Sequence, residues 1–428
     1  MAIDKLKDLT PLINTVLSRK TQALILLLSQ IAAKRNYTVY LVGGTVRDLL
    51  LGKESRDLDF AVQPDAISFA EIINTYLKGK LQTFAQFGTA RILLPSGKDL
   101  DLVTPRREFY AAPGDSPEVE KSDLKNDLHR RDFTINTMAC SINLKNFGFL
   151  YDFFGGYSDL QQGLIRVLYN LSFIDDPLRI FRAIRFEQRF GFQIEKETYT
   201  FLQRAVQEKV VERVSRGKLK AELASLLTEE YPPAILRRLQ DIGLFPYLFP
   251  ALRLSSHNWY LVEKAYRLLL KKKNAGERPI EPLVLYLCSF YFRPGEFDIR
   301  SACRNLRLPK KMSKKIIEIM ERTPSLLEKL SGDKLSDSEL FALLEPLSLE
   351  HRSFLEVVGS EKVCSRLQYY HDRLVNIRPF LNGKDLEALG FPPGPIYTEI
   401  LEAVKKARLN GEILTRKEEE EYVRKYFS

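Results

Sequence analysis

The sequence has little of what builds disulfide frameworks, zinc sites or membrane spans. Its four cysteines lie far apart and form no CxxC pair, which argues against both a disulfide framework and a structural zinc site. Its four histidines are scattered without metal-ligand spacing. The apolar run Ala23–Ala33 is interrupted by Ser29 and Gln30 and is too short to span a bilayer. We therefore expect a protein that does not cross a membrane and does not depend on cysteine or histidine ligands.

The N-terminus and the composition bound the class of protein further. The opening MAIDKLKDLT has the pattern of neither a secretory signal nor a transit peptide, so we expect a cytoplasmic protein. A length of 428 residues allows roughly two to four domains. The net charge of +10 indicates a polyanionic partner, nucleic acid before membrane, although a generally basic protein would show the same excess.

What is present is organised around Leu41–Phe60, which reads LVGGTVRDLLLGKESRDLDF. An apolar strand, Thr38–Val42, runs into a double glycine, where backbone N–H groups can approach an anion. Asp57 and Asp59 are two apart on a second strand, so they share one face. This combination suits a divalent metal held against a nucleoside triphosphate. Taken singly, Asp-x-Asp is common on exposed strand ends and Gly-Gly is common in turns.

A third carboxylate is available on a later strand of the same region. Asp101 and Asp99 have the same parity, and we prefer Asp101 because it lies deeper in the strand LDLVT. Three carboxylates at a sheet edge can bind two Mg²⁺ ions, which polarise an α-phosphate and stabilise pyrophosphate as the leaving group. A solvated strand carboxylate is the ordinary alternative for Asp101.

The stretch RRDFTINTMA, residues 130–139, is a second candidate for nucleotide contacts. Arg131 can meet a phosphate, and Asp132 or Asn136 can hydrogen-bond ribose hydroxyls. If the stretch is helical, Asp132 and Asn136 lie on one face because they are four apart. The alternative is an Asp132 that only caps a helix.

The stretch DDPLRIFRAIRF, residues 175–186, predicts a helix that begins near Asp175-Asp176-Pro177. Arg179, Arg182 and Arg185 recur every three residues along one side of it. An Asp176–Arg179 pair can imitate a Watson–Crick edge, because the carboxylate accepts from an exocyclic amine while the guanidinium donates to ring acceptors. The alternative is an intrahelical salt bridge of little energetic weight.

The remaining pattern predicts an α/β part followed by a helical part. Residues 1–35 are expected to be helical and residues 36–168 to form a mixed α/β domain. The expected elements of that domain are strands at Thr38–Val42, Leu58–Val62, Thr89–Leu94, Leu100–Thr104, Met138–Ile142 and Leu164–Val167, and a helix at Ala66–Leu77. The 22 residues Pro105–Asn126 have neither period and predict a long mobile loop. From Ser172 onward the pattern is almost wholly helical, with a break near Arg373–Asn382.

Two cation clusters lie in the helical part, KKK at 271–273 and PKKMSKK at 309–315. They can meet the phosphates of a folded RNA, an interaction that weakens with salt. A solvated helix face is the equally ordinary alternative.

In this order and spacing, the motifs resemble those of the bacterial class II tRNA nucleotidyltransferases, in the poly(A) polymerase and CCA-adding superfamily. The RRDFTIN of that family stands at Arg130–Asn136, and its (E/D)DPxRxxRxxRF stands at Asp175–Phe186. Its GxDLxxLGxxPGP resembles the segment from Asn382. The GGxVRDxLLG and DxD of the family correspond to Gly43, Gly44, Val46, Arg47, Asp48, Gly52, Asp57 and Asp59.

The resemblance implies an α+β fold: an N-terminal mixed α/β nucleotidyltransferase palm, the head, followed by an all-α neck, body and tail. The implied parts are an N-terminal helical extension at 1–35, the head at 36–168, a neck for base recognition at 169–245, and a tRNA-binding body and tail at 246–375 and 376–428. Base selection is implied to take place in a single pocket without a nucleic-acid template.

The implied activity is the addition of CCA to the 3′ end of tRNA from CTP and ATP, with Mg²⁺ as cofactor and pyrophosphate released. The tRNA partner is expected to be contacted at its 3′ end and its acceptor and T arms. Asp57, Asp59 and Asp101 are the implied catalytic residues, and Asp57 and Asp59 the metal ligands. The implied nucleotide-binding residues are Gly43, Gly44, Arg47, Asp48, Arg131, Asp132, Asn136, Asp176, Arg179, Arg182 and Arg185.

Two departures from the family pattern affect these roles, and three alternatives stay open. Many members have Glu at the position of Asp175, and many have an acidic residue where VSRGKLKAEL at 214–223 has Gly217. One alternative adds only the terminal A or only the two Cs, and the length of the 105–126 loop favours the former over the latter. A poly(A) polymerase is a second alternative. A catalytically silent RNA-binding protein is the third.

Overall fold

The computed structural model describes residues 8–55, 57–109, 118–249, 252, 254–292 and 299–427. The chain divides into two compact units, the first formed by Met1–Glu230 with Ala234–Tyr247 and the second by Tyr231–Pro233 with Leu248–Ser428. This division is coarser than the five parts expected from the sequence, which stay a prediction. Among the described residues, every helix is too short or too polar to cross a bilayer.

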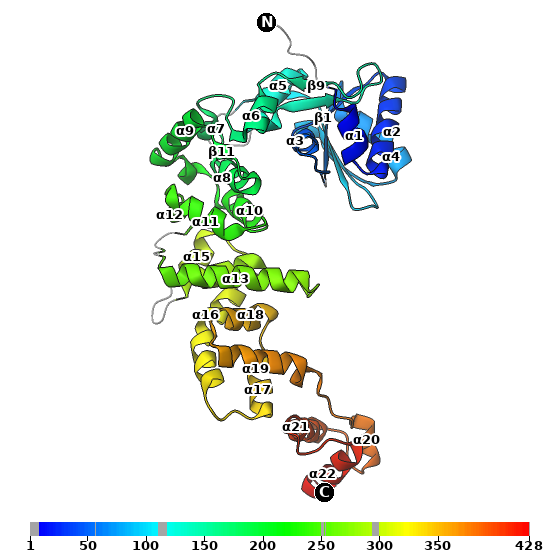
Figure 1. Ribbon diagram of the computed structural model, residues 1–428. Helices are drawn as coiled ribbons and strands as arrows, with labels where there is room; N and C mark the ends of the chain where they lie inside the picture. The colour runs from blue at the N-terminus through cyan, green and yellow to red at the C-terminus, as the bar shows by residue number, and fades with distance from the viewer. Residues whose placement is uncertain are drawn as a thin grey trace. The chain divides into compact units, whose positions relative to one another are not determined.

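A seven-stranded sheet is the centre of the first unit. The strands lie in the order β3-β4-β5-β2-β1-β8-β9. Figure 1 labels β1 and β9 of this sheet. Neighbours β2 and β5 run parallel, and the other neighbours are antiparallel. The bounds are β1 Thr38–Val42, β2 Leu58–Gln63, β3 Lys80–Phe84, β4 Thr89–Leu93, β5 Asp99–Val103, β8 Met138–Ser141 and β9 Leu150–Asp152.

Apolar side chains on the central strands fix the register of this sheet. Val39, Leu41, Phe60, Leu100 and Leu102 are fully or almost fully buried, and burying such side chains stabilises each strand in one register. The helices of this region are α1 Thr10–Val16, α2 Arg19–Arg35, α3 Gly44–Leu50 and α4 Ala66–Leu77, and α2 and α4 contact the sheet.

Several predicted elements are confirmed. The strand at Thr38–Val42 and the helix at Ala66–Leu77 have the predicted bounds, and the side chain of Asp65 caps that helix by accepting from the backbone N–H of Ser68. The predicted strand at Leu164–Val167 is reduced to β10 Leu164–Ile165. It pairs with β11 Gln193–Ile194 instead of joining the large sheet.

The prediction of an irregular loop at Pro105–Asn126 is wrong for its two ends. Arg106–Phe109 (β6) and Glu118–Lys121 (β7) pair as an antiparallel ribbon. Residues 110–117, between β6 and β7 in the sequence, lie outside the described residues. Backbone hydrogen bonds hold the ribbon, and most of its described side chains are exposed or half-buried, so it has no apolar alternation that a sequence pattern could detect.

Helices follow the sheet, as predicted. The helix predicted to begin near Pro177 is α8, which spans Leu178–Phe190. At its start the carboxylate of Asp176 accepts a hydrogen bond from the backbone N–H of Leu178 at 3.1 Å. The other helices that follow β9 in this part are α6 Gly156–Gln162, α7 Ser172–Asp175, α9 Lys196–Gln207, α10 Arg216–Leu226, α11 Pro232–Asp241 and α12 Phe245–Leu248, and α5 Leu124–His129 precedes β8.

The second unit is helical in all its regular described elements, which confirms the predicted fold class. Its helices are α13 Ser256–Asn274, α14 Pro282–Tyr291, α15 Ile299–Asn305, α16 Lys310–Ser331, α17 Asp337–Leu344, α18 Leu349–Val358, α19 Glu361–Asp372, α20 Gly383–Ala388, α21 Pro395–Leu409 and α22 Arg416–Phe427.

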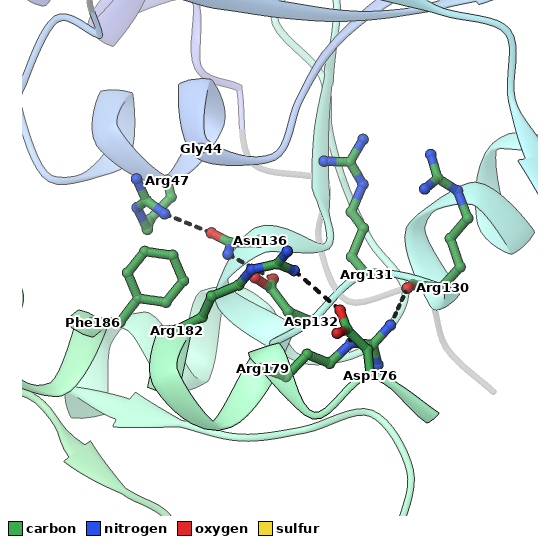
Figure 2. Close-up of a pocket in the computed structure, with 10 residues that line it drawn as sticks. All are labelled: Gly44, Arg47, Arg130, Arg131, Asp132, Asn136, Asp176, Arg179, Arg182 and Phe186. Atoms are coloured by element: carbon green, nitrogen blue, oxygen red, sulfur yellow. Dashed lines mark hydrogen bonds and ion pairs between the residues drawn. The ribbon is translucent and has the colours of Figure 1, made fainter. Parts of the chain in front are cut away.

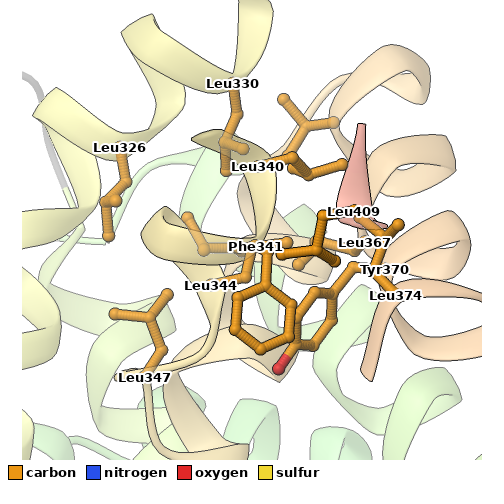
Figure 3. Packing of buried hydrophobic residues seen from close by; sticks show 12 residues of the cluster. Leu326, Leu330, Leu340, Phe341, Leu344, Leu347, Leu367, Tyr370, Leu374 and Leu409 are labelled. Carbon is orange, nitrogen blue, oxygen red and sulfur yellow. The ribbon is translucent and has the colours of Figure 1, made fainter. Parts of the chain in front are cut away.

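Two apolar clusters lie in this unit. The first, which we call the leucine cluster, is shown in Figure 3 and includes Leu330, Leu344, Phe341 and Tyr370 from α16, α17 and α19. The second gathers Leu386, Ile400, Val404 and other residues of the last three helices. Leu409, the last residue of α21, belongs to the leucine cluster, although Ile400, Val404 and Ala407 of the same helix pack in the second.

Candidate active site

The turn after β1 requires a glycine at its first position. Gly43 has φ +66° and ψ −131°, a backbone conformation that glycine adopts without steric cost. A Cβ at this position would lie 2.3 Å from Nη1 of Arg131 and 3.8 Å from a carboxylate oxygen of Asp59. The glycine therefore lets β1 pass close to both side chains, and α3 begins directly after it.

The predicted carboxylates meet on neighbouring strands. Asp59 on β2 is the direct register partner of Asp101 on β5, and Asp57 precedes Asp59 by two residues and is exposed. Burial raises the pKa of Asp59 to about 6; the charges of Asp101 and Asp57 add to this rise, while Arg131 opposes it. A bound cation would stabilise the charged form of a carboxylate in such a setting.

These carboxylates fit a divalent metal only in part. Among the described residues, Asp57 and Asp59 form no salt bridge, so both are available as oxygen ligands. Asp101 is paired differently: Nε and Nη2 of Arg91 donate to its two oxygens at 2.6 and 2.7 Å. Accordingly, no group of three metal-ligating side chains is preassembled within the described residues. Asp99 is the first residue of β5 and the register partner of Leu93.

A cavity of about 500 Å³ lies beside this edge and is rich in arginine (Figure 2). Arg131 lies between the cavity and the carboxylate edge, since it lines the cavity and its charge lowers the pKa of Asp59. The cavity is lined by Gly44, Arg47, Arg130, Arg131, Asp132, Asn136, Asp176, Arg179, Arg182 and Phe186. Such a concentration of guanidinium groups suits a polyanionic ligand such as a triphosphate.

Arg47 is buried at the floor of this cavity. Its guanidinium donates to Asp48 at 2.7 and 2.9 Å and to Asn136 at 2.7 Å. It also lies 5.3 and 4.8 Å from the ring centres of Phe186 and Phe190 on α8, close enough for cation–π attraction. Arg47 therefore ties α3 to α8, in addition to lining the cavity.

Asp132 and Asn136 contact one another, but not on a helix. The amide of Asn136 donates to Asp132 at 2.9 Å, and the N–H of Phe133 donates to the same carboxylate oxygen at 2.9 Å. The backbone is extended at Phe133 and forms only a short 3₁₀ turn at Thr134–Asn136. The side chains thus converge through the turn, and both line the cavity.

The three arginines of α8 have different surroundings. Arg179 is 3% exposed and donates to the Ser172 hydroxyl at 2.6 Å and to the Arg130 carbonyl at 2.8 Å. Asp176 lies 3.8 Å from the guanidinium of Arg179 and 3.4 Å from that of Arg182. Asp176 and these two arginines all line the cavity.

Arg185, by contrast, is not among the residues that line the cavity. It contacts the Ser225 hydroxyl and lies 3.5 Å from Glu222 of α10 and 3.9 Å from Glu229. A Cβ at Gly217, one of the two departures from the family pattern, would have nothing within 4 Å. Gly217 thus has no neighbour to contact, and Glu222 is the residue of α10 whose carboxylate pairs with Arg185 of α8.

Two protein families match parts of the chain. The Poly A polymerase head domain matches residues 39–166, and the family described as probable RNA and SrmB-binding site of polymerase A matches residues 191–254. The A-adding tRNA nucleotidyltransferase of Halalkalibacterium halodurans is 30% identical over 426 residues, which is 98% of this chain and 96% of that protein. The chain belongs to the bacterial class II tRNA nucleotidyltransferases.

Other class II tRNA nucleotidyltransferases extend the comparison. The A-adding enzyme of Geobacter sulfurreducens is 36% identical over 421 residues, which is 96% of this chain but 48% of that protein, so the chain spans about half its length. A structure of the Thermotoga maritima CCA-adding enzyme complexed with tRNA-CCA has a TM-score of 0.76 and 33% identity, and the match covers 100% of both chains. Nucleotidyltransferases of this family use divalent metal ions.

Four residues at this class II site were not predicted from the sequence. Arg130 and Phe186 line the cavity, Arg91 binds Asp101, and Asp127 lies beneath the cavity arginines. Asp127 is fully buried and lies 2.7 Å from Arg130 and 3.2 Å from Arg131. Burial alone would raise its pKa, but the two arginines hold the pKa of Asp127 below its usual value. Its position three and four residues before these arginines was the signal that the sequence offered.

Proposed function

We propose that this chain adds nucleotides to the 3′ end of tRNA, completing CCA from CTP and ATP with release of pyrophosphate. The observation that carries the proposal is the arginine-lined cavity beside the carboxylates of β2 and β5. The Thermotoga maritima relative in complex with tRNA-CCA supports the choice of substrate. A cytoplasmic location stays a prediction from the sequence.

In the proposed reaction, the tRNA 3′-hydroxyl attacks the α-phosphate of the bound nucleotide. Gly44 presents the turn at the start of α3, and Arg131 binds the triphosphate. Asp132 and Asn136, which are hydrogen-bonded to one another, accept and donate to ribose hydroxyls. Asp127 keeps Arg131 in place beneath the triphosphate.

Base selection is proposed for Asp176, Arg179 and Arg182. The carboxylate of Asp176 lies within 4 Å of both guanidiniums, so acceptor and donor groups stand side by side, as on a Watson–Crick edge. Arg179 is anchored to Ser172 and Arg130, whereas Arg182 is a third exposed and can turn. One anchored and one adjustable donor suit a site that accepts two different bases.

We propose Mg²⁺ as the metal, with Asp57 and Asp59 as its ligands. When bound there, the metal would polarise the α-phosphate and stabilise the pyrophosphate leaving group. If an Asp57→Ala variant incorporated labelled ATP and CTP into tRNA at the unchanged rate, this ligand assignment would be wrong.

The second unit is proposed to bind the rest of the tRNA. It has a cavity of about 680 Å³ lined by several cations, among them Arg304, Arg307, Lys310 and Lys314. Lys315 of the predicted PKKMSKK cluster is instead paired with Glu350 at 2.6 Å. RNA binding through this surface should weaken steeply with salt, because phosphate contacts release counterions.

A second candidate function is the addition of the terminal A alone. The two relatives named above from Halalkalibacterium and Geobacter are A-adding enzymes, whereas the tRNA-bound Thermotoga neighbour is a CCA-adding enzyme. Both functions include the step from CC to CCA, and they differ in whether CTP is used.

Three tRNA substrates separate these functions. One ends at the discriminator base, one at C and one at CC, and each is supplied with CTP, ATP or both. Extension of all three to CCA supports the first function, and extension of only the CC substrate, by one A, supports the second. Long A tails on any RNA would indicate a poly(A) polymerase. No pyrophosphate release with any substrate would overturn both functions and indicate an RNA-binding protein.

A further inference from the structure

Three side chains form a row across the sheet at the carboxylate edge. Arg91 on β4 is the direct register partner of Asp101 on β5, and Asp101 is the direct partner of Asp59 on β2. Direct partners on adjacent strands point to the same face of a sheet. The row therefore places an arginine, a carboxylate and a second carboxylate side by side on the face that carries Asp57.

The arginine and the middle carboxylate form a two-pronged ion pair. Nε and Nη2 of Arg91 donate to the two oxygens of Asp101 at 2.6 and 2.7 Å, so each oxygen accepts one hydrogen bond from the guanidinium. This bidentate geometry is the strong and directional form of an arginine–carboxylate contact. The Arg91 and Asp101 side chains are 47% and 32% exposed, respectively, and exposed pairs contribute little to folding stability. The main effect of the Arg91–Asp101 pair is therefore to orient the Asp101 carboxylate and to compensate its charge.

The orientation and charge compensation of Asp101 affect the proposed metal site. A carboxylate whose two oxygens accept from one guanidinium is oriented toward it, and its charge is compensated. Asp57 and Asp59, by contrast, form no salt bridge among the described residues. A divalent cation approaching this edge meets two available carboxylates and one that an arginine already holds.

We propose that Arg91 is a positioning residue that withholds Asp101 from the metal site. The site then binds metal through Asp57 and Asp59, and Asp101 becomes a ligand only when the two-pronged pair opens. The affinity of the edge for a divalent cation is set in part by a residue that does not touch the cation. This inference rests on the proposed function, because it concerns the same metal site.

The test measures Mn²⁺ binding to the full chain without nucleotide or tRNA, by electron paramagnetic resonance of the unbound ion. An R91Q variant is expected to bind Mn²⁺ roughly three- to ten-fold more tightly, because the competing ion pair is gone. The same substitution made in a D101N background is expected to have no such effect, since no withheld ligand is left to release. R204Q is the matched control, because Arg204 of α9 carries the same charge and forms an exposed ion pair with Glu208, the residue that follows the helix.

The outcomes separate this inference from the metal assignment itself. Unchanged or weaker binding by R91Q overturns the inference. A gain that persists in the D101N background, or that R204Q reproduces, also overturns it, because charge alone would then explain the effect. Loss of Mn²⁺ binding in a D57N variant is the separate check on the metal site, and normal binding by that variant would overturn the assignment of Asp57. Circular dichroism of each variant confirms that it is folded.

Discussion

The carboxylate edge of the first unit and the leucine cluster of the second are built in opposite ways. At the edge, charged groups lie close together, and the pKa of Asp59 is raised mainly because its carboxyl is largely removed from water, with a smaller contribution from the charges of Asp101 and Asp57. In the leucine cluster, Leu330, Leu344 and Leu374 are almost completely removed from water. The edge keeps carboxylate oxygens available at a cost in folding stability. The cluster, by contrast, stabilises the fold and contains no reactive groups. Substitutions in the two regions should therefore change different measured quantities.

The largest expected effect is at Asp59. An Asp59→Asn variant should lose about a thousand-fold in the rate of nucleotide incorporation, because the metal loses a charged ligand. Its thermal midpoint should stay within a few degrees of the wild-type value, since Asp59 has no salt bridge among the described residues to lose. Single-turnover incorporation and calorimetry give the two readouts. Glu71→Gln, an exposed carboxylate on α4, is the control and should change neither.

The next effect is on stability, in the leucine cluster. Leu344→Ala should lower the free energy of unfolding by roughly 3 kcal/mol, from lost burial and the cavity left behind. Urea denaturation followed by circular dichroism measures this value. Mn²⁺ binding to the first unit should be unchanged under native conditions. A variant that lost metal binding while remaining folded would break the proposed separation between the two regions.

A smaller effect should come from a polar residue inside the second unit. His351 is 1% exposed and lies 3.3 Å from the Thr323 hydroxyl, and burial lowers its pKa to about 4. Between pH 6.5 and 4 the unfolded chain takes up a proton on His351 that the folded chain does not, so stability falls as the pH falls. The wild type should lose about 1 kcal/mol per pH unit more than His351→Gln in this window. Parallel urea titrations of both proteins would contradict this if their pH slopes were equal.

The smallest expected effect is on the stability of the Arg91 variant. Arg91→Gln removes a two-pronged ion pair, yet the free energy of unfolding should change by less than about 0.5 kcal/mol, because the pair is exposed. The measurement is the same urea titration. A loss of several kcal/mol would mean that the pair supports the sheet, and the contrast between edge and cluster would then be weaker than proposed.

The sequence predicted the elements in which apolar side chains face the core and polar side chains face the solvent. Thr38–Val42 and Ala66–Leu77 were predicted with the observed bounds because apolar residues recur at the period of a strand and of a helix. The ribbon of β6 and β7 was missed because backbone pairing, which leaves no side-chain pattern, holds it. Within the candidate site, Asp57, Asp59 and Arg131 were predicted from their motifs, and their roles stay predictions.

Other features of the site depend on register and packing between distant segments. The pairing of Arg91 with Asp101 follows from the alignment of β4 and β5, which neither strand reveals alone. Regular spacing placed Arg185 with the other arginines of α8, but each step of three residues turns about 60° around a helix. That rotation carries Arg185 to α10 and away from the cavity.

One helix of the second unit belongs to two cores. Ile400 and Val404 of α21 pack in the cluster of the last three helices, while Leu409, at the end of the same helix, packs in the leucine cluster. Lys405 adds a contact 4.0 Å from the ring centre of Phe341, and the Asn410 side chain accepts from the N–H of Ser338 at 3.0 Å. A chain cut before α21 would therefore lose its last helices and also leave an opening in the core that precedes them. The C-terminal helices are therefore joined to α17 by side-chain packing and a hydrogen bond as well as by the chain itself.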